Sequence, residues 1–168
     1  YDVESIKPGI IHLGLGNFHR AHQALYLDDL FNMGLDHSWG IVGSGVMPHD
    51  AAMRKALFEQ DLLTTVVELE PGANRVRVIG SMVDFLPVES GNPSLIRALC
   101  NPEIRIVSMT ITEGGYFIDP ATGKFNPNFP QMIDDSKNLE TPKTVFGVLV
   151  QALKLRLQKG IPPFTVMS

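Results

Sequence analysis

The 168 residues are the length of one domain, and a content of 44% hydrophobic and 19% charged residues is typical of a folded globular chain. A formal net charge of −4 provides no basic surface for a phosphate backbone, so we expect no nucleic-acid partner. No apolar stretch approaches the ~20 residues of a membrane span, and residues 1–8 lack the layout of a signal peptide, which predicts a cytoplasmic protein without a membrane partner.

Strand and helix patterns alternate along the first part of the chain. Residues 9–14 are an apolar run ending in glycine, which is typical of a buried strand. Residues 18–33 place apolar side chains three and four positions apart and predict a helix. A second apolar strand over 39–42 and a helix over 50–60, with Asp50 near its N-terminus, follow.

The alternation is then interrupted by two segments rich in β-branched residues. They cover residues 64–68 and 75–79, and Pro71 and Gly72 lie between them. Because proline and glycine favour turns, the pair predicts an antiparallel hairpin inserted into the alternating pattern.

The second half of the chain returns to alternating patterns. Residues 93–100 predict a helix, and 104–111 are the most strand-like segment, suited to the centre of a sheet. Residues 119–130 are rich in Pro, Gly and Asn and predict a surface loop. A long amphipathic helix over 141–159 and a strand over 164–167 complete the pattern. Since parallel strands need helical crossovers, the fold class is a doubly wound α/β sheet, mostly parallel, with an inserted hairpin.

Gly14 and Gly16 occupy the turn between the first strand and the first helix, where such sheets bind a dinucleotide pyrophosphate. Gly14 permits a tight turn, and Gly16 lets the main chain approach a diphosphate at the helix N-terminus. His19 stands where the fingerprint G-x-G-x-x-G has its third glycine. On the two glycines alone, a plain turn therefore remains an alternative to a binding site.

Charged and polar residues follow this turn directly. Arg20, with or without His19, is a candidate to hold phosphate charge through hydrogen bonds. His19 and His22 lie three apart and could pair at a zinc ion, but the other histidines complete no ligand set, so we expect no metal. Cys100, the single cysteine, lies in an apolar helical pattern and predicts packing rather than a reactive thiol.

Three further candidates lie after the predicted strands. Asp50 follows the second strand and is the candidate acid for the adenosine ribose hydroxyls, where it would repel the extra phosphate of NADP; simple helix capping is the alternative, and the two roles are compatible. Residues 110–116 follow the strongest strand, so Thr112 and Glu113 would face the nicotinamide end of a cofactor. For Glu113, a general base and a solvated or capping carboxylate both remain open.

Four stretches carry a resemblance to a known family. They read GLGNFHRAHQ over 14–23, TITEGGY over 110–116, PKTVFG over 142–147 and PFTVMS over 163–168. On these motifs the chain resembles the polyol-specific long-chain dehydrogenases, which include mannitol dehydrogenase and the fructuronate and tagaturonate reductases. The likeness runs along nearly the whole chain, and Phe-His-Arg-Ala-His after Gly-x-Gly is its most specific part.

The resemblance implies an NAD-binding Rossmann domain over 1–168 and zinc-independent hydride transfer between NAD(H) and a sugar alcohol or keto sugar. It maps the pyrophosphate-binding residues onto Gly14, Gly16, Phe18, His19 and Arg20. It places the acid that favours NAD at Asp50. In the family the catalytic lysine belongs to a later helical domain, so we expect the chain to be an inactive fragment and assign no catalytic residue in it.

Several functions therefore stand as hypotheses. The first is the cofactor domain of an enzyme that interconverts D-mannitol and D-fructose, with a fructuronate or tagaturonate reductase as its alternative. A nucleotide or S-adenosylmethionine binding module also uses a glycine turn, but its acid usually stands at the tip of the second strand, where this chain has residues 43–45. A domain without measurable cofactor affinity is the third.

Overall fold

The structure of the chain, a computed structural model, describes residues 1–111 and 113–168, and of Glu113 the backbone alone. Its centre is a five-stranded parallel sheet in the order β5-β2-β1-β6-β7. Numbered among themselves, these strands have the Rossmann order 3-2-1-4-5. The predicted doubly wound fold is therefore confirmed. The strands are β1 (Pro8–Leu13), β2 (Gly40–Ser44), β5 (Met82–Phe85), β6 (Ile106–Met109) and β7 (Thr165–Met167).

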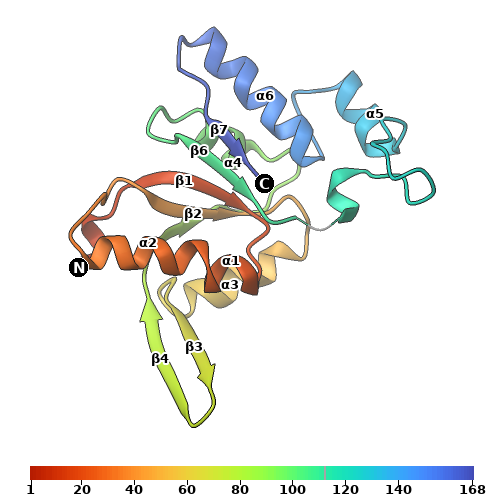
Figure 1. Ribbon diagram of the computed structural model, residues 1–168. Coiled ribbons are helices and arrows are strands. Elements are labelled where there is room, and N and C mark those ends of the chain that lie inside the picture. The colour runs from red at the N-terminus through yellow and green to blue at the C-terminus, as the bar shows by residue number, and fades with distance from the viewer. Residues whose placement is uncertain (112) are drawn as a thin grey trace.

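Helices cover both faces of this sheet (Figure 1). In β2, Ile41 packs into the core cluster on the side of α2 and α3, and Val42 into the cluster on the side of α4 and α6. Both side chains are buried because successive residues of a strand point to opposite faces. The four helices are α2 (Gln23–Asn32), α3 (Asp50–Phe58), α4 (Pro93–Leu99) and α6 (Val145–Gln158).

The single helix expected over residues 18–33 is wrong, because the chain forms two helices there. A short α1 (Asn17–Ala21) precedes α2, and His22 between them has φ −124° and ψ −86°. These angles break the helical ladder, although the Tyr26 amide still donates to the His22 carbonyl at 2.9 Å. Apolar residues keep their helical spacing across the break, so periodicity could not reveal it.

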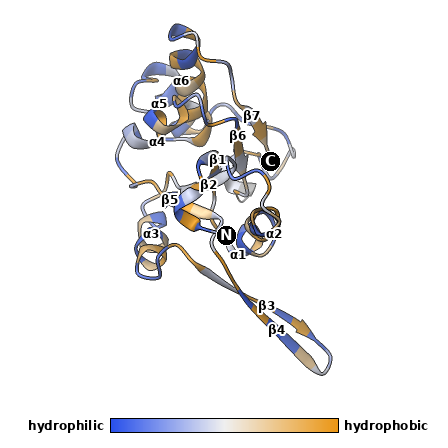
Figure 2. Cartoon of the chain, turned by 90° about the vertical axis from the view of Figure 1, so that its left-hand side faces the viewer, coloured by the Kyte–Doolittle hydropathy of each residue, from blue (hydrophilic) through white to orange (hydrophobic). Residues whose placement is uncertain are grey.

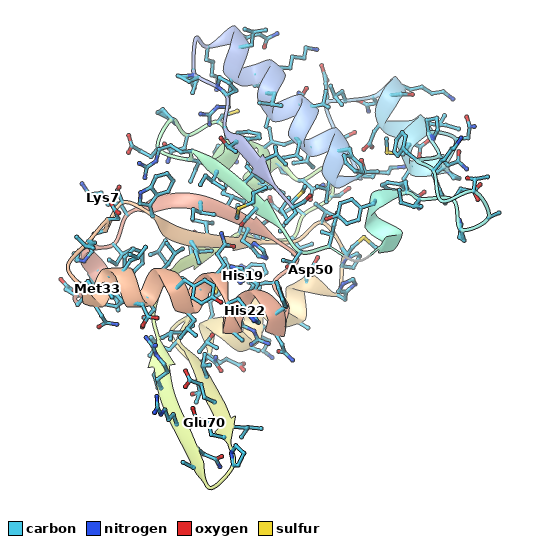
Figure 3. The ribbon with its side chains drawn as sticks, viewed as in Figure 1. Lys7, His19, His22, Met33, Asp50 and Glu70 are labelled. Atoms are coloured by element: carbon cyan, nitrogen blue, oxygen red, sulfur yellow. The ribbon has the colours of Figure 1, made fainter. Side chains whose placement is uncertain are left out.

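The predicted hairpin is confirmed as β3 (Thr64–Glu70) and β4 (Ala73–Ile79), which pair in antiparallel register from Thr64 opposite Ile79 to Glu70 opposite Ala73. Figures 1 and 2 show this ribbon projecting away from the sheet, with Glu70 near its tip in Figure 3. Val66 and Ile79 at its base join the core beside α2 and α3, which anchors the ribbon to the domain.

The sequence patterns do not reveal β5 and α5 (Pro130–Lys137). β5 has only four residues and includes the polar Asp84, and α5 is a largely polar helix that follows the predicted loop. The strand expected over 104–111 is shorter, because only Ile106–Met109 pairs with its neighbours. Two 3-10 turns, Val3–Ser5 and Glu113–Tyr116, complete the described elements.

The helix expected over 141–159 begins later, at Val145, because the residue before it is a cap. The Thr144 hydroxyl accepts the Gly147 amide at 3.0 Å. The buried carboxylate of Asp135 accepts the Thr144 amide at 2.9 Å and the Lys143 amide at 2.8 Å. α5 is thereby fixed against the start of α6.

Candidate functional site

A cavity of about 720 Å³ lies beyond the carboxyl ends of the parallel strands. This is the place where doubly wound sheets bind ligands, at the point where the strand order reverses between β1 and β6. The glycine turn, the loop from β2 to α3, the segment after β6 and the start of α6 all contribute to its wall. Lining residues that matter below are Gly14, Gly16, Asp50, Thr110 and Lys143.

The two glycines of the turn are needed for different reasons. Gly14 has φ +89°, and a Cβ there would lie 2.7 Å from the carbonyl oxygen of Thr110, so the residue that follows β6 excludes a side chain. Gly16 has an ordinary extended conformation, and an ideal Cβ would come no closer than 4.0 Å to any described atom. The space left open at Gly16 adjoins the cavity, and a ligand can approach the main chain there.

The start of α1 retains hydrogen-bonding capacity. The Gly16 amide donates to the Gly14 carbonyl at 2.8 Å, and the Arg20 amide donates to the Gly16 carbonyl at 3.3 Å. Among the described residues no side chain caps the helix at Gly16. Since the first amides of a helix have no intrahelical acceptor, those of residues 17–19 are available to an acceptor from outside.

Phe18, His19 and Arg20 surround the turn but are not among the described residues that line the cavity. Phe18 is 66% exposed and stacks on His22, with ring centroids 4.4 Å apart. Arg20 donates to the side chain of Asn17. The spacing of His19 and His22 alone would allow a zinc pair. In the structure, however, His19 is buried and His22 is exposed (Figure 3).

His19 lies behind the turn, against the sheet. Its ring stacks on that of His12 with centroids 3.6 Å apart, and its two nitrogens have no hydrogen-bond partner within the described part of the chain. Burial lowers the pKa of His19 to about 3, with the neighbouring His12 and Arg20 charges as further causes. Burial likewise lowers the pKa of His12 to about 4. Both imidazoles are therefore neutral at pH 7.

Asp50 is the first residue of α3 and lines the cavity (Figure 3). Its Oδ2 accepts the Met47 amide at 2.9 Å, and its carboxylate fills the space in which a Cβ at Gly45 would lie. His49 Nε2 lies 3.7 Å from Oδ1. The capping alternative is not what the structure shows, because the N-cap position is His49 and no side chain caps α3 there. Asp50 instead holds the loop between β2 and α3 through the Met47 amide, and from the same position it presents negative charge at the cavity.

Thr112 and the side chain of Glu113 lie outside the described residues, so the roles expected for them stay predictions. The glycines that follow, Gly114 and Gly115, belong to the cavity wall. The main chain after β6 is thus close to the site, as the position of this motif indicated.

Three residues near the site were not predicted from the sequence as site residues. Thr110 donates through Oγ1 to the Gly14 carbonyl at 2.7 Å. His12 lies 3.0 Å from the same hydroxyl, and a histidine inside an otherwise apolar strand was the signal that it needs buried partners. Lys143 has a side chain that is 60% exposed and pairs with Asp134 at 2.7 Å, and it lines the cavity as well.

Two further properties concern metal ligands and membrane-spanning helices. Among the side chains that the structure describes, those of residues 1–111 and 114–168, no group of three or more His, Cys, Asp or Glu could hold a metal ion. None of the helices in the described part of the chain is long and apolar enough to cross a membrane.

Comparison with known proteins places the chain among relatives of known activity. The sequence family described as the mannitol dehydrogenase Rossmann domain matches residues 8–168. Mannitol 2-dehydrogenase of Cereibacter sphaeroides is 54% identical over 168 residues, which are all of this chain and 35% of that protein. Polyol:NADP oxidoreductase of Gluconobacter oxydans (strain 621H) is 44% identical, again over all of this chain and 35% of the relative.

A solved structure agrees with these sequence matches. Mannitol 2-dehydrogenase of Pseudomonas fluorescens, determined as a ternary complex with NAD and D-mannitol, superposes with a TM-score of 0.91 at 47% identity. The match covers 100% of this chain and 34% of that one. The chain thus spans about a third of the length of the relatives it matches.

Proposed function

The chain belongs to the mannitol dehydrogenase family, and on this premise we propose that it is the NAD-binding Rossmann domain of a polyol dehydrogenase. The whole enzyme interconverts a sugar alcohol and a ketose, with D-mannitol and D-fructose as the first pair to test. Fructuronate or tagaturonate reduction is the alternative within the same chemistry. Residues 1–168 form the cofactor domain, and a helical domain elsewhere in the protein supplies the catalytic base.

One observation supports this function above all. Gly16 lacks a side chain although its own surroundings would accept one, and the space so left adjoins the cavity at the carboxyl ends of β1 and β6. A diphosphate is the ligand group that binds best to exposed main-chain N–H groups at the start of a helix. The glycine turn therefore fits a dinucleotide better than an uncharged ligand.

Asp50 sets the choice between NAD and NADP. Its carboxylate lines the same cavity as the glycine turn, and Oδ2 is the oxygen that holds the Met47 amide, which leaves Oδ1 for a ligand. A carboxylate at this end of the site accepts the ribose hydroxyls and repels a 2′-phosphate. Since one relative is named a polyol:NADP oxidoreductase, the preference needs a direct test.

The residues of this chain bind and orient; they do not transfer protons to the substrate. Bound NAD supplies the hydride acceptor. Gly14 and Gly16 fix the diphosphate through the main chain, Asp50 fixes the adenosine ribose, and Gly114 and Gly115 leave room along the segment after β6. The substrate pocket and catalytic base lie outside residues 1–168, so this domain alone turns over neither mannitol nor fructose. We infer that the enzyme acts in the cytoplasm; the buried free thiol of Cys100 is compatible with a reducing compartment.

Titration calorimetry with NAD and NADP tests the cofactor assignment. We expect the domain to bind NAD at least about tenfold more tightly than NADP, a preference of ~1.4 kcal/mol. Asp50→Asn retains an oxygen for the Met47 amide but loses the charge, so it should reduce the preference. Glu103→Gln, an exposed change after α4, is the matched control.

The outcomes separate the parts of this function. Equal affinities of the unaltered domain for NAD and NADP would remove Asp50 from its role, and failure to bind either cofactor would refute the dinucleotide site. For the substrate, the rates of the full-length enzyme with D-mannitol and with a uronate-derived keto acid decide between the two alternatives.

A further inference from the structure

His12 is a fully buried polar residue at the centre of the sheet. Its neighbours in β1 are Ile10, Ile11 and Leu13, all of them buried and apolar. A buried imidazole costs free energy unless its nitrogens have hydrogen-bond partners. We therefore expect the histidine at this position to make hydrogen bonds that an aliphatic side chain could not make.

Both ring nitrogens of His12 find partners on the neighbouring strand β6 and the residue just after it. Nδ1 lies 2.7 Å from Ser108 Oγ, and Nε2 lies 3.0 Å from Thr110 Oγ1. Each hydroxyl contacts the segment that follows β1: Thr110 donates to the Gly14 carbonyl at 2.7 Å, and Ser108 is 3.0 Å from the Gln23 side-chain oxygen. The single proton of the Ser108 hydroxyl goes either to Nδ1 or to the Gln23 oxygen, so the continuous link from the imidazole to the segment after β1 is the one through Thr110 to the glycine turn.

The hydrogen bond from Thr110 fixes the orientation of the Gly14 carbonyl within the turn. A neutral imidazole carries one N–H, and a proton on Nε2 lets Thr110 accept from His12 while it donates to Gly14. The Gly14 carbonyl also accepts the Gly16 amide at 2.8 Å, so two donors hold it. Because the peptide unit is planar and trans, a fixed carbonyl of Gly14 also fixes the opposite direction of the Leu15 amide.

The face of the His12 ring provides a third link. His19, in α1, stacks on it with an interplanar angle of 17°. α1 has only five residues and ends at the break at His22, so it has little stability of its own. The contact with His12 holds α1 in place between the glycine turn and α2.

We propose that His12 is a positioning residue, which holds the turn from Gly14 to Gly16 and the start of α1 in the conformation that binds a diphosphate. It acts through Thr110 and His19 and does not itself belong to the described cavity wall. This role rests on the proposed function, since it concerns the same cofactor site. It predicts that loss of the His12 nitrogens weakens recognition of the diphosphate but not of the nucleoside.

The first test compares NAD and ADP with adenosine, which has no diphosphate. His12→Phe retains a flat ring against His19 but removes both nitrogens, and should weaken binding of NAD and ADP about tenfold, with adenosine changed less than about twofold. Thr110→Val should act in the same way, and Thr110→Ser, which keeps the hydroxyl, should recover most of the affinity. Ser81→Ala, which removes a buried hydroxyl that donates to the Ala24 carbonyl and not to His12 or the turn, is the matched control.

The second test needs no ligand. Amide hydrogen exchange over residues 14–20 should be faster in His12→Phe than in the unaltered domain, and unchanged in Ser81→Ala. Equal weakening of adenosine and ADP, or unchanged exchange in the turn, would overturn the positioning role. If the unaltered domain binds neither NAD nor ADP, the proposed function fails, and exchange still decides whether His12 fixes the turn.

Discussion

The imidazole rings of His12 and His19 are stacked, with centroids 3.6 Å apart and planes inclined by 17°. Both rings are almost completely buried, and burial holds their pKa values near 4 and 3. Two cations at this separation in a region of low dielectric would repel strongly. Burial and this repulsion both favour neutral rings in the folded state, which makes the stability of this part of the fold dependent on pH.

We expect the free energy of unfolding to fall as the pH is lowered from about 6.5 to about 4.5. In the unfolded chain a histidine binds a proton near its ordinary pKa of 6.5, whereas the folded rings resist protonation down to about 4 and 3. The stabilisation is therefore fully present above about pH 6.5 and is lost toward lower pH. For one such histidine the loss by pH 4.5 is on the order of 2 kcal/mol, which urea unfolding at several pH values measures.

His19→Phe is the matched variant for this dependence. It keeps an aromatic ring against His12 but removes one titrating group, so its unfolding free energy should change less between pH 6.5 and 4.5. Other carboxylates and histidines contribute equally to both proteins and cancel in the comparison. Parallel pH profiles for the two proteins would show that the stack does not titrate as described.

Gly14 and Gly16 should respond oppositely to the same substitution. Gly14→Ala places a methyl group 2.7 Å from the Thr110 carbonyl at a φ of +89°, so we expect a loss of about 3 kcal/mol of stability. Gly16→Ala meets no described atom closer than 4.0 Å and should change stability by less than about 0.5 kcal/mol. Its methyl group would occupy the place of the diphosphate and should weaken NAD binding at least about tenfold.

Urea unfolding and titration calorimetry on both variants check this pair. Gly16→Ala that binds NAD as tightly as the unaltered domain would show that no ligand approaches the main chain at this position. A folded and stable Gly14→Ala would contradict the close packing of the turn on β6.

The sequence predicted the fold and indicated a candidate site at the end of the first strand, because both inferences depend on local patterns. The apolar run before Gly14 identifies the end of a strand, and Asp50 identifies the start of a helix. Neither inference needs knowledge of distant residues. The parallel sheet then follows from the alternation of strands and helices. For the same reason β5 was missed, since its four residues include Asp84 and lack a clear pattern.

The network behind the turn could not be predicted from local patterns. His12 binds Ser108 and Thr110, which lie 96 and 98 positions away along the chain and become neighbours only when β1 pairs with β6. The break at His22 was also missed, because apolar spacing continues through it. A buried histidine in an apolar strand showed that partners were needed but not which residues provide them.

Arg156 should be among the most sensitive positions outside the site. This buried side chain in α6 donates to the backbone carbonyls of Leu99 at 2.7 Å, Asn101 at 3.0 Å and Pro162 at 2.6 Å. Arg156→Met leaves these three carbonyls without their donor and should lower the unfolding free energy by about 3 kcal/mol. Arg156→Lys retains the charge but not the fork of donors and should lie between Arg156→Met and the unaltered domain in thermal unfolding. A melting temperature unchanged in Arg156→Met would show that these carbonyls find other partners.

Asp135 and Asp134 are adjacent acids in α5 with opposite expected sensitivity. Asp135 is buried and accepts the Thr144 hydroxyl at 2.6 Å in addition to the Lys143 and Thr144 amides, whereas Asp134 is half exposed and pairs with the Lys143 side chain. Asp135→Ala removes acceptors from the start of α6 and should cost about 3 kcal/mol, a decrease of roughly 10 °C in the melting temperature. Asp134→Ala breaks an exposed pair and should change the melting temperature by about 1 °C or less. Because Lys143 and Thr144 line the cavity, Asp135→Ala should also weaken NAD binding. Equal effects of the two substitutions on the melting temperature would show that Asp135 does not fix the start of α6.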